Sequence, residues 1–215
     1  MIASRVSRMQ LCFFFVVVLS AMPLRGQTVE DLLTRAELTD FAETTSYDEV
    51  MALSEGLAEL SENIHLTTFG YTNEGRALPL LVIGAPDASA AAVLRTGKTR
   101  VYVQGNIHGG EVCGKEALLM LLRRYAMGVY PNWTDELVLL IAPIYNADGN
   151  ERVSLRNRPR QHGPIGGMGQ RPNAQGLDLN RDHIKLDSPE ARSLVRLMTE
   201  YDPHVAVDLH TTNGT

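Results

Sequence analysis

Cysteine is scarce in this sequence, which contains only Cys12 and Cys113. Cys12 lies in an apolar stretch near the amino terminus, and once that stretch is removed on export Cys113 has no intramolecular partner. A scaffold held together by disulfides is therefore excluded. At 215 residues the chain is long enough for one substantial hydrophobic core. Its stability must come from that core or from a bound metal ion.

Basic residues are also in the minority. The formal net charge is −5 with histidine counted as neutral, and removal of residues 1–26, which contain three arginines and no acidic residue, takes it to −8. Nucleic-acid backbones bind to basic surfaces, so we expect no nucleic-acid partner. The sequence contains no internal repeat and no low-complexity tract, and nothing in it indicates an oligomeric state.

Long hydrophobic runs are missing as well. The apolar run over residues 11–19 is shorter than the about 20 residues that span a bilayer. Arg5 and Arg8 precede this run and small residues follow it. The arrangement predicts a secretory signal peptide over residues 1–26, a secreted or periplasmic location, and no stable membrane anchor after cleavage.

Apolar periodicity predicts alternating strands and helices, and hence an α/β fold. We predict strands over residues 66–71, 78–83, 101–103, 137–142 and 205–210, and helices over residues 47–60, 112–127 and 188–201. The polar residues 73–76 between the first two strands are typical of a hairpin turn. Residues 145–187 lack periodicity, and such long loops in compact domains are usually functional or disordered. We interpret this loop as an ordered part of a site.

A glycine-rich corner follows the strand at residues 101–103. It carries His108 and Glu111 with two glycines between them, and glycine lets the backbone approach a ligand closely. An imidazole and a carboxylate at the carboxyl end of a strand can converge on one cation. The alternative is that His108 caps the next helix while Glu111 complements the helix dipole. Two ligands alone do not make a catalytic zinc site, which takes three protein ligands.

His210 is the candidate third ligand. It lies at the carboxyl end of the last predicted strand, as His108 follows the strand at residues 101–103. If these strands are neighbours in one sheet, both histidines point into the same crevice. His108, Glu111 and His210 then form a set of two histidines and one glutamate, a ligand type of catalytic zinc. His204 begins the last strand, so we expect it at the opposite edge of the sheet.

These residues and three further segments resemble the zinc metallocarboxypeptidase family, the peptidases similar to carboxypeptidase A. The segments occur in the order of the family's motifs and are Glu74-Gly75-Arg76, Asn146-Ala147-Asp148-Gly149 and Asp178-Leu179-Asn180-Arg181. The resemblance implies a three-layer α/β/α fold with a mixed, mostly parallel sheet, and Zn²⁺ bound by His108, Glu111 and His210. It also implies hydrolysis, through a metal-activated water, of the C-terminal peptide bond of a peptide substrate with a free C-terminal carboxylate.

The resemblance also assigns roles to polar residues of the long loop. Asn180 and Arg181 bind the terminal carboxylate of the substrate, which a guanidinium group matches in bidentate fashion. Asp178 orients the first histidine ligand through a hydrogen bond. A further arginine stabilises the oxyanion of the reaction, and Arg171 fits this position best, with Arg158 second.

The chain departs from the family pattern at its carboxyl end. The family's general-base glutamate and a substrate-contacting tyrosine lie well downstream of the third ligand, whereas the sequence stops five residues after His210. We therefore expect residues 27–215 to be a catalytic domain truncated after the third zinc ligand, with the last strands of its sheet missing. Such a chain would bind zinc without useful peptide hydrolysis. Glu190 lies on the helix after the loop, and Asp208 is expected to face away from His210, so neither should replace the glutamate.

Two alternative functions stay open. One is a zinc deacylase of the aspartoacylase or desuccinylase kind, which shares the ligand set and the Asp-Leu-Asn-Arg stretch. The export signal and the Asn-Ala-Asp-Gly turn count against it. The other is a non-catalytic remnant that binds zinc or peptides.

Overall fold

The computed structural model describes residues 28–212, so the predicted signal peptide lies outside the described residues. Within them a five-stranded sheet has the order β1-β2-β4-β3-β5. The strands are β1 (Ile64–Tyr71), β2 (Ala77–Ile83), β3 (Thr99–Gly105), β4 (Leu137–Ala142) and β5 (Val205–Leu209). β2 is antiparallel to both of its neighbours, and the other four strands run in one direction. The predicted mixed, mostly parallel sheet is confirmed.

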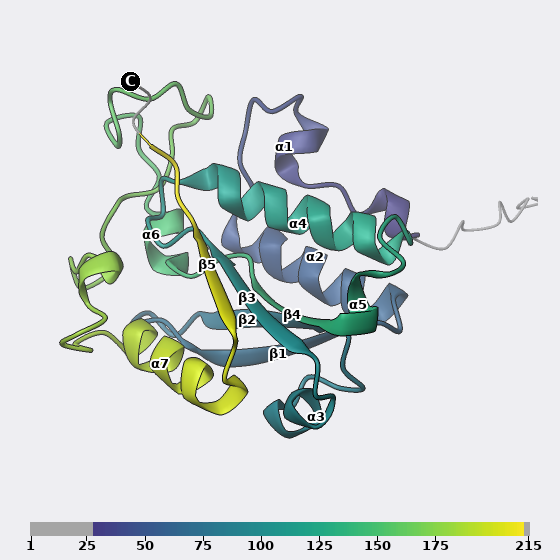
Figure 1. The fold of residues 1–215 in the computed structure, drawn as a ribbon. Helices are drawn as coiled ribbons and strands as arrows, with labels where there is room; N and C mark the ends of the chain where they lie inside the picture. The colour runs from purple at the N-terminus through teal and green to yellow at the C-terminus, as the bar shows by residue number, and fades with distance from the viewer. Residues whose placement is uncertain (1–27, 213–215) are drawn as a thin grey trace, which may run out of the picture.

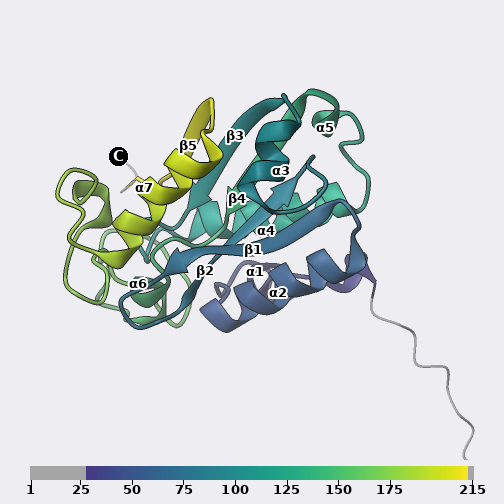
Figure 2. The ribbon, with the colours of Figure 1, turned by 90° about the horizontal axis from the view of Figure 1, so that it is seen from below.

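Helices cover both faces of this sheet (Figure 1, Figure 2). α2 (Tyr47–Leu60) and α4 (Val112–Ala126) pack on one face, and α3 (Ala90–Arg95) and α7 (Pro189–Tyr201) pack on the other. The helices predicted at 47–60 and 112–127 begin where the sequence indicated. Ser46 caps α2 by accepting a hydrogen bond from the Glu49 amide, as serine does at many helix starts. The three-layer α/β/α architecture is confirmed.

β4 explains why the sheet needs a helical layer on each side. Val138 and Leu140 belong to the core that includes α7 residues, and Leu139 and Ile141 belong to the core that includes α2 and α4 residues. All four are almost fully buried. Side chains alternate between the faces of a strand, so an uninterrupted apolar strand must be covered twice.

The remaining elements are short helical turns in the connections. They are η1 (Val29–Asp31), α1 (Arg35–Leu38), α5 (Trp133–Glu136), α6 (Ala147–Glu151) and η2 (Leu179–Arg181). The last two lie in the long loop at residues 145–187. Over residues 28–212, no helix combines the length and the apolar character needed to cross a membrane.

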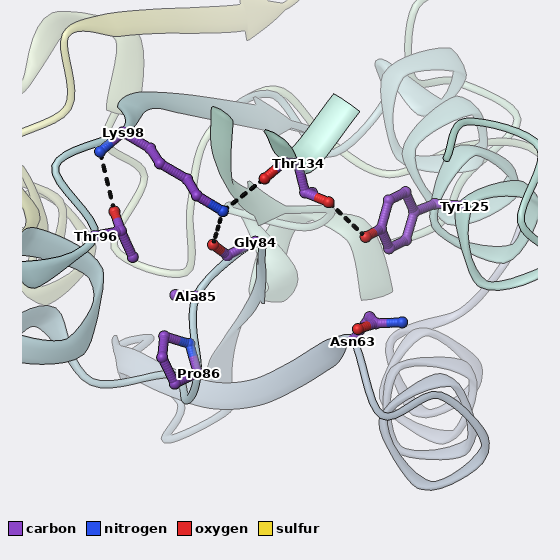
Figure 3. A pocket seen from close by; sticks show the side chains of 8 residues that line it. All are labelled: Asn63, Gly84, Ala85, Pro86, Thr96, Lys98, Tyr125 and Thr134. Atoms are coloured by element: carbon purple, nitrogen blue, oxygen red, sulfur yellow. Dashed lines mark hydrogen bonds between the residues drawn. The ribbon is translucent and has the colours of Figure 1, made fainter. Parts of the chain in front are cut away.

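A lysine ties the elements together at one end of the sheet (Figure 3). Beside a hollow of about 370 Å³, Lys98 Nζ donates to the carbonyls of Gly84, 3.1 Å away, and Thr134, 2.6 Å away. Lys98 is the residue just before β3, and its two bonds connect the end of β2 to α5. The candidate metal ligands lie at the other end of β3, so this hollow is separate from them.

Candidate metal centre

The two histidines meet because β3 and β5 are neighbouring parallel strands. Their register pairs Gly105 with Leu209, so the chain leaves both strands at the same edge of the sheet. His108 and His210 follow within a few residues, and their ring centroids lie 5.3 Å apart. His204 lies at the opposite end of β5, where its Nδ1 accepts a hydrogen bond from the Arg100 amide over 3.0 Å.

The corner after β3 is built around a buried asparagine and two glycines. Asn106 has φ of 63° and is fully buried, and its Nδ2 donates to the Gly109 carbonyl over 3.1 Å. A Cβ at Gly109 would lie 2.3 Å from the carbonyl carbon of Gly149, and one at Gly110 would lie 2.6 Å from the carbonyl oxygen of Gly169. Glycine is therefore required because the long loop packs directly on the corner.

Three ligand-type side chains converge at this corner. His108 Nδ1 lies 2.9 Å from Glu111 Oε1, and His210 Nδ1 lies 2.8 Å from Glu111 Oε2. Each of the three residues offers one ligand atom, and these three atoms all lie within 4.8 Å of one another. The remaining ring nitrogens are engaged by other carboxylates, so Nδ1 is the atom that each histidine presents.

This donor set fits a zinc ion. Two imidazoles and one carboxylate are the protein ligands of one type of catalytic zinc site, which keeps a fourth position open for water or substrate. His108 and Glu111 are almost fully buried, whereas the His210 side chain is 35% exposed. Because two of the ligands are buried and His210 is partly exposed, a substrate could reach the ligand group from the side of His210.

Positive charge and hydrogen bonds keep the glutamate ionised. Arg158 donates to Glu111 Oε1, and the Thr211 amide donates to Oε2 over 3.0 Å. Burial by itself would raise the pKa of the Glu111 carboxyl, but hydrogen bonds from His108, Thr211 and Arg158 outweigh burial and lower this pKa to about 2. The carboxylate is therefore available as a metal ligand throughout the physiological pH range.

Asp178 links the first histidine to a second arginine. Its Oδ1 lies 3.0 Å from His108 Nε2, while its Oδ2 accepts hydrogen bonds from Arg171 Nε over 3.0 Å and from Nη2 over 2.8 Å. Burial raises the pKa of Asp178, but the bonds to His108 and Arg171 dominate and lower it. Arg171 Nη1 also comes within 3.5 Å of His108 Nδ1. Both arginines singled out by the sequence thus lie against the ligand group.

Asn180 and Arg181 follow Asp178 on η2. The Asn180 amide donates to Asp178 Oδ1 over 3.0 Å. The Arg181 side chain is exposed and donates to the Asn180 carbonyl over 2.7 Å. The contacts recorded for these two residues, within the part of the chain that the structure describes, do not reach the candidate metal ligands.

The expectation that Asp208 faces away from His210 is wrong. Asp208 Oδ2 lies 2.9 Å from His210 Nε2. The two residues are two positions apart, and side chains two positions apart on a strand point to the same face. Glu190 does lie elsewhere, as expected: it is buried on α7, and its carboxylate faces the Asn73 amide and the Asn173 side chain, both 3.3 Å away.

Sequence reasoning also missed the roles of two asparagines. The sequence-based predictions give Asn106 no role, although its place just before the glycine corner that carries the ligands could have indicated one. Asn146 was noted only as part of a motif. Its Nδ2 donates to the carbonyls of Ile107, 3.3 Å away, and Arg171, 3.1 Å away. Asn146 therefore joins the ligand corner to the segment that carries Arg171.

The α/β sheet gathers two histidines and a glutamate at the carboxyl ends of adjacent parallel strands, which is a ligand set found in catalytic zinc sites. Residues 50–214 match the model of the zinc carboxypeptidase family, and this chain belongs to that family. Carboxypeptidase 2 of Trichophyton rubrum is 31% identical over 143 residues, which are 65% of this chain and 23% of that protein. Carboxypeptidase E of Caenorhabditis elegans is 34% identical over 159 residues, which are 69% of this chain and 32% of that protein.

Solved structures share the fold. Carboxypeptidase A from Helicoverpa armigera matches with a TM-score of 0.62 and 20% identity, covering 86% of this chain and 52% of that one. A metallo-carboxypeptidase from Burkholderia cenocepacia matches with a TM-score of 0.57 and 21% identity, covering 77% of this chain and 41% of that one. The chain spans about a quarter of the length of the fungal carboxypeptidases it matches.

Proposed function

We propose that this chain carries the metal centre and the carboxylate-recognition segment of a zinc carboxypeptidase, which hydrolyses the C-terminal peptide bond of a substrate. The observation that supports this most is the set of donor atoms of His108, Glu111 and His210, all within 4.8 Å of one another. When bound, the zinc ion supplies Lewis-acid polarisation of a carbonyl and activation of water.

The protein's own residues hold and orient the reacting groups in this proposal. The two histidines bind the metal through Nδ1 and Glu111 binds through its carboxylate. Arg171 stabilises the oxyanion, because Asp178 fixes its Nε and Nη2 while Nη1 stays directed at His108. Arg158 is the second choice, since its side chain is only 11% exposed and already pairs with Glu111.

The terminal carboxylate of the substrate binds to Asn180 and Arg181. Arg181 is exposed, and its guanidinium can meet a carboxylate with two parallel hydrogen bonds. η2 places both residues directly after Asp178, which contacts His108. A peptide whose carboxylate binds at η2 can therefore extend across the metal ligands.

In this proposal, the part of the peptide upstream of the cleaved bond would lie in a cavity beside the metal ligands. A cavity of about 830 Å³ is lined by Gly110 and Thr211, each next to a metal ligand in the sequence, and by the apolar side chains of Phe41, Met120 and Pro164. The lining also contains Glu43, Glu116, Arg160 and His162, so the cavity offers both apolar and charged contacts to a peptide. Export of the enzyme, as residues 1–26 predict, would bring it to extracellular or periplasmic peptides.

Side-by-side assays of the full-length gene product test this function. Blocked dipeptides with a free carboxyl group should be hydrolysed, and a zinc chelator should abolish the reaction. The same dipeptides with an amidated terminus should react far more slowly. Faster hydrolysis of N-acyl amino acids than of peptides would instead favour a deacylase, and no chelator-sensitive reaction with either substrate would contradict the proposal.

A further inference from the structure

We infer that Asp208 is a positioning residue for the third metal ligand: it holds His210 by Nε2 so that Nδ1 faces the metal. This inference rests on the proposed zinc site. Asp208 Oδ2 lies 2.9 Å from His210 Nε2, and His210 Nδ1 lies 2.8 Å from Glu111 Oε2. The imidazole thus lies between a carboxylate that orients it and the ligand group that it completes.

The strand register fixes this arrangement. The pairing of β3 with β5 matches Gln104 with Asp208 and Gly105 with Leu209, so Asp208 is the second-to-last residue of β5 in this ladder. The side chain two positions later lies on the same face. Asp208 therefore reaches His210 from a backbone that the sheet holds in place, although His210 itself follows the strand.

The exposure of His210 explains why such support matters. Its side chain is 35% exposed, against 2% for His108. The ring of His108 is enclosed by its surroundings, whereas the more exposed ring of His210 depends to a greater extent on its polar contacts for its orientation. A hydrogen bond from Nε2–H to a carboxylate fixes both the ring orientation and the nitrogen that carries the proton. The lone pair is then left on Nδ1.

The two histidines are held by matching pairs that differ in one respect. Each has a carboxylate at Nε2: Asp178 for His108 and Asp208 for His210. Asp178 also forms an ion pair with Arg171, whereas the ion pair recorded for Asp208, within residues 28–212, is with His210. The negative charge of Asp208 is therefore directed at the imidazole, which strengthens His210 as a donor to a cation.

Zinc affinity of the full-length protein tests the inference. Dissociation constants are measured by competition with a chromophoric chelator for the wild type, Asp208→Ala, Asp208→Asn and the control Asp202→Asn. Asp202 lies just before the other end of β5 and pairs with Arg100. Loss of a carboxylate that supports a metal-binding histidine typically weakens metal binding about 10–100-fold. We expect that loss for Asp208→Ala, a smaller loss for Asp208→Asn, which keeps an oxygen acceptor, and no change in the control.

A spectroscopic readout separates positioning from general stability. In the zinc-loaded wild type, the Nε2 proton of His210 should give a downfield, slowly exchanging resonance, which Asp208→Ala should remove while that of His108 remains. If a folded Asp208 variant keeps wild-type zinc affinity and an unchanged His210 resonance, the inference about Asp208 is overturned, while the proposed metal centre is not affected. If the wild type binds no zinc, the proposed metal centre itself is wrong and the inference fails with it.

Discussion

Asn106 donates a hydrogen bond from Nδ2 to the Gly109 carbonyl over 3.1 Å while its own backbone lies at φ of 63°. Its side chain thereby closes the corner that presents His108 and Glu111. The same amide comes within 3.4 Å of the His108 carbonyl and 3.5 Å of the Glu111 carbonyl. Asparagine suits this position, because it tolerates the left-handed region better than most residues and offers a short amide donor.

Replacement of Asn106 should therefore be costly for two separable reasons. Asn106→Ala adds backbone strain of about 1–2 kcal/mol and leaves a buried carbonyl without its donor, at about 1–3 kcal/mol. Asn106→Gly removes only the donor, apart from a small entropic effect. The free energy of unfolding from urea titration should fall in the order wild type, Gly variant, Ala variant. Equal stability of the two variants would show that the strain contributes nothing.

Arg181→Ala should separate substrates by their termini. With the full-length enzyme, kcat/KM for free-acid peptides should fall by the equivalent of about 2–5 kcal/mol, the usual cost of truncating one partner of a charge pair. Hydrolysis of amidated peptides should change little. Arg181→Lys keeps the charge but loses the planar fork, so it should recover only part of the activity. Lys185→Ala, on the same exposed segment, is the control. Equal losses on both kinds of substrate would contradict the assignment of Arg181.

Lys115 should make stability depend on alkaline pH. It is fully buried on α4, where Nζ donates to the Thr45 carbonyl and, over 2.7 Å, to Asn150 Oδ1. Burial lowers its pKa to about 8, although Glu116 and other carboxylates act in the opposite direction. Between this value and an unfolded pKa of about 10.4 the unfolded chain binds more protons, so this group makes the protein more stable as pH rises through that window.

The contribution of Lys115 is the difference between the wild type and a variant in how the free energy of unfolding changes with pH. Urea unfolding of the wild type and of Lys115→Met is measured from pH 7 to pH 11. The free energy of unfolding of the wild type should rise relative to the variant, by at most about 1.4 kcal/mol per pH unit. Parallel curves would show that Lys115 titrates normally in the folded protein.

The sequence predicted the layers of the fold and the meeting of the candidate ligands for a common reason. Apolar strands such as residues 137–142, and the caps and apolar stripes of the helices, are local patterns whose consequence is a covered sheet. If β3 and β5 are neighbouring parallel strands, as the structure has them, strand direction alone brings His108 and His210 together.

The differences from the sequence-based predictions have two causes. Asp208 was expected to face away from His210, although side chains two positions apart on a strand share a face. The bond from Asn146 to the Arg171 carbonyl joins segments 25 residues apart inside a loop without periodicity, so no local pattern encodes it. The contacts of Arg158 with Glu111 and of Arg171 with His108 also join distant segments. The sequence alone could therefore order these two arginines as candidates for the oxyanion role only by their place in the family motifs.

Zinc stoichiometry tests the metal centre most directly. Metal analysis of folded full-length protein, with folding checked by circular dichroism, should give one zinc ion per chain for the wild type and for the control His183→Ala, whose side chain is exposed. His108→Ala, Glu111→Gln and His210→Ala should each lose most of the zinc, because each removes one of three protein ligands. Full zinc occupancy in all three folded variants would contradict the site.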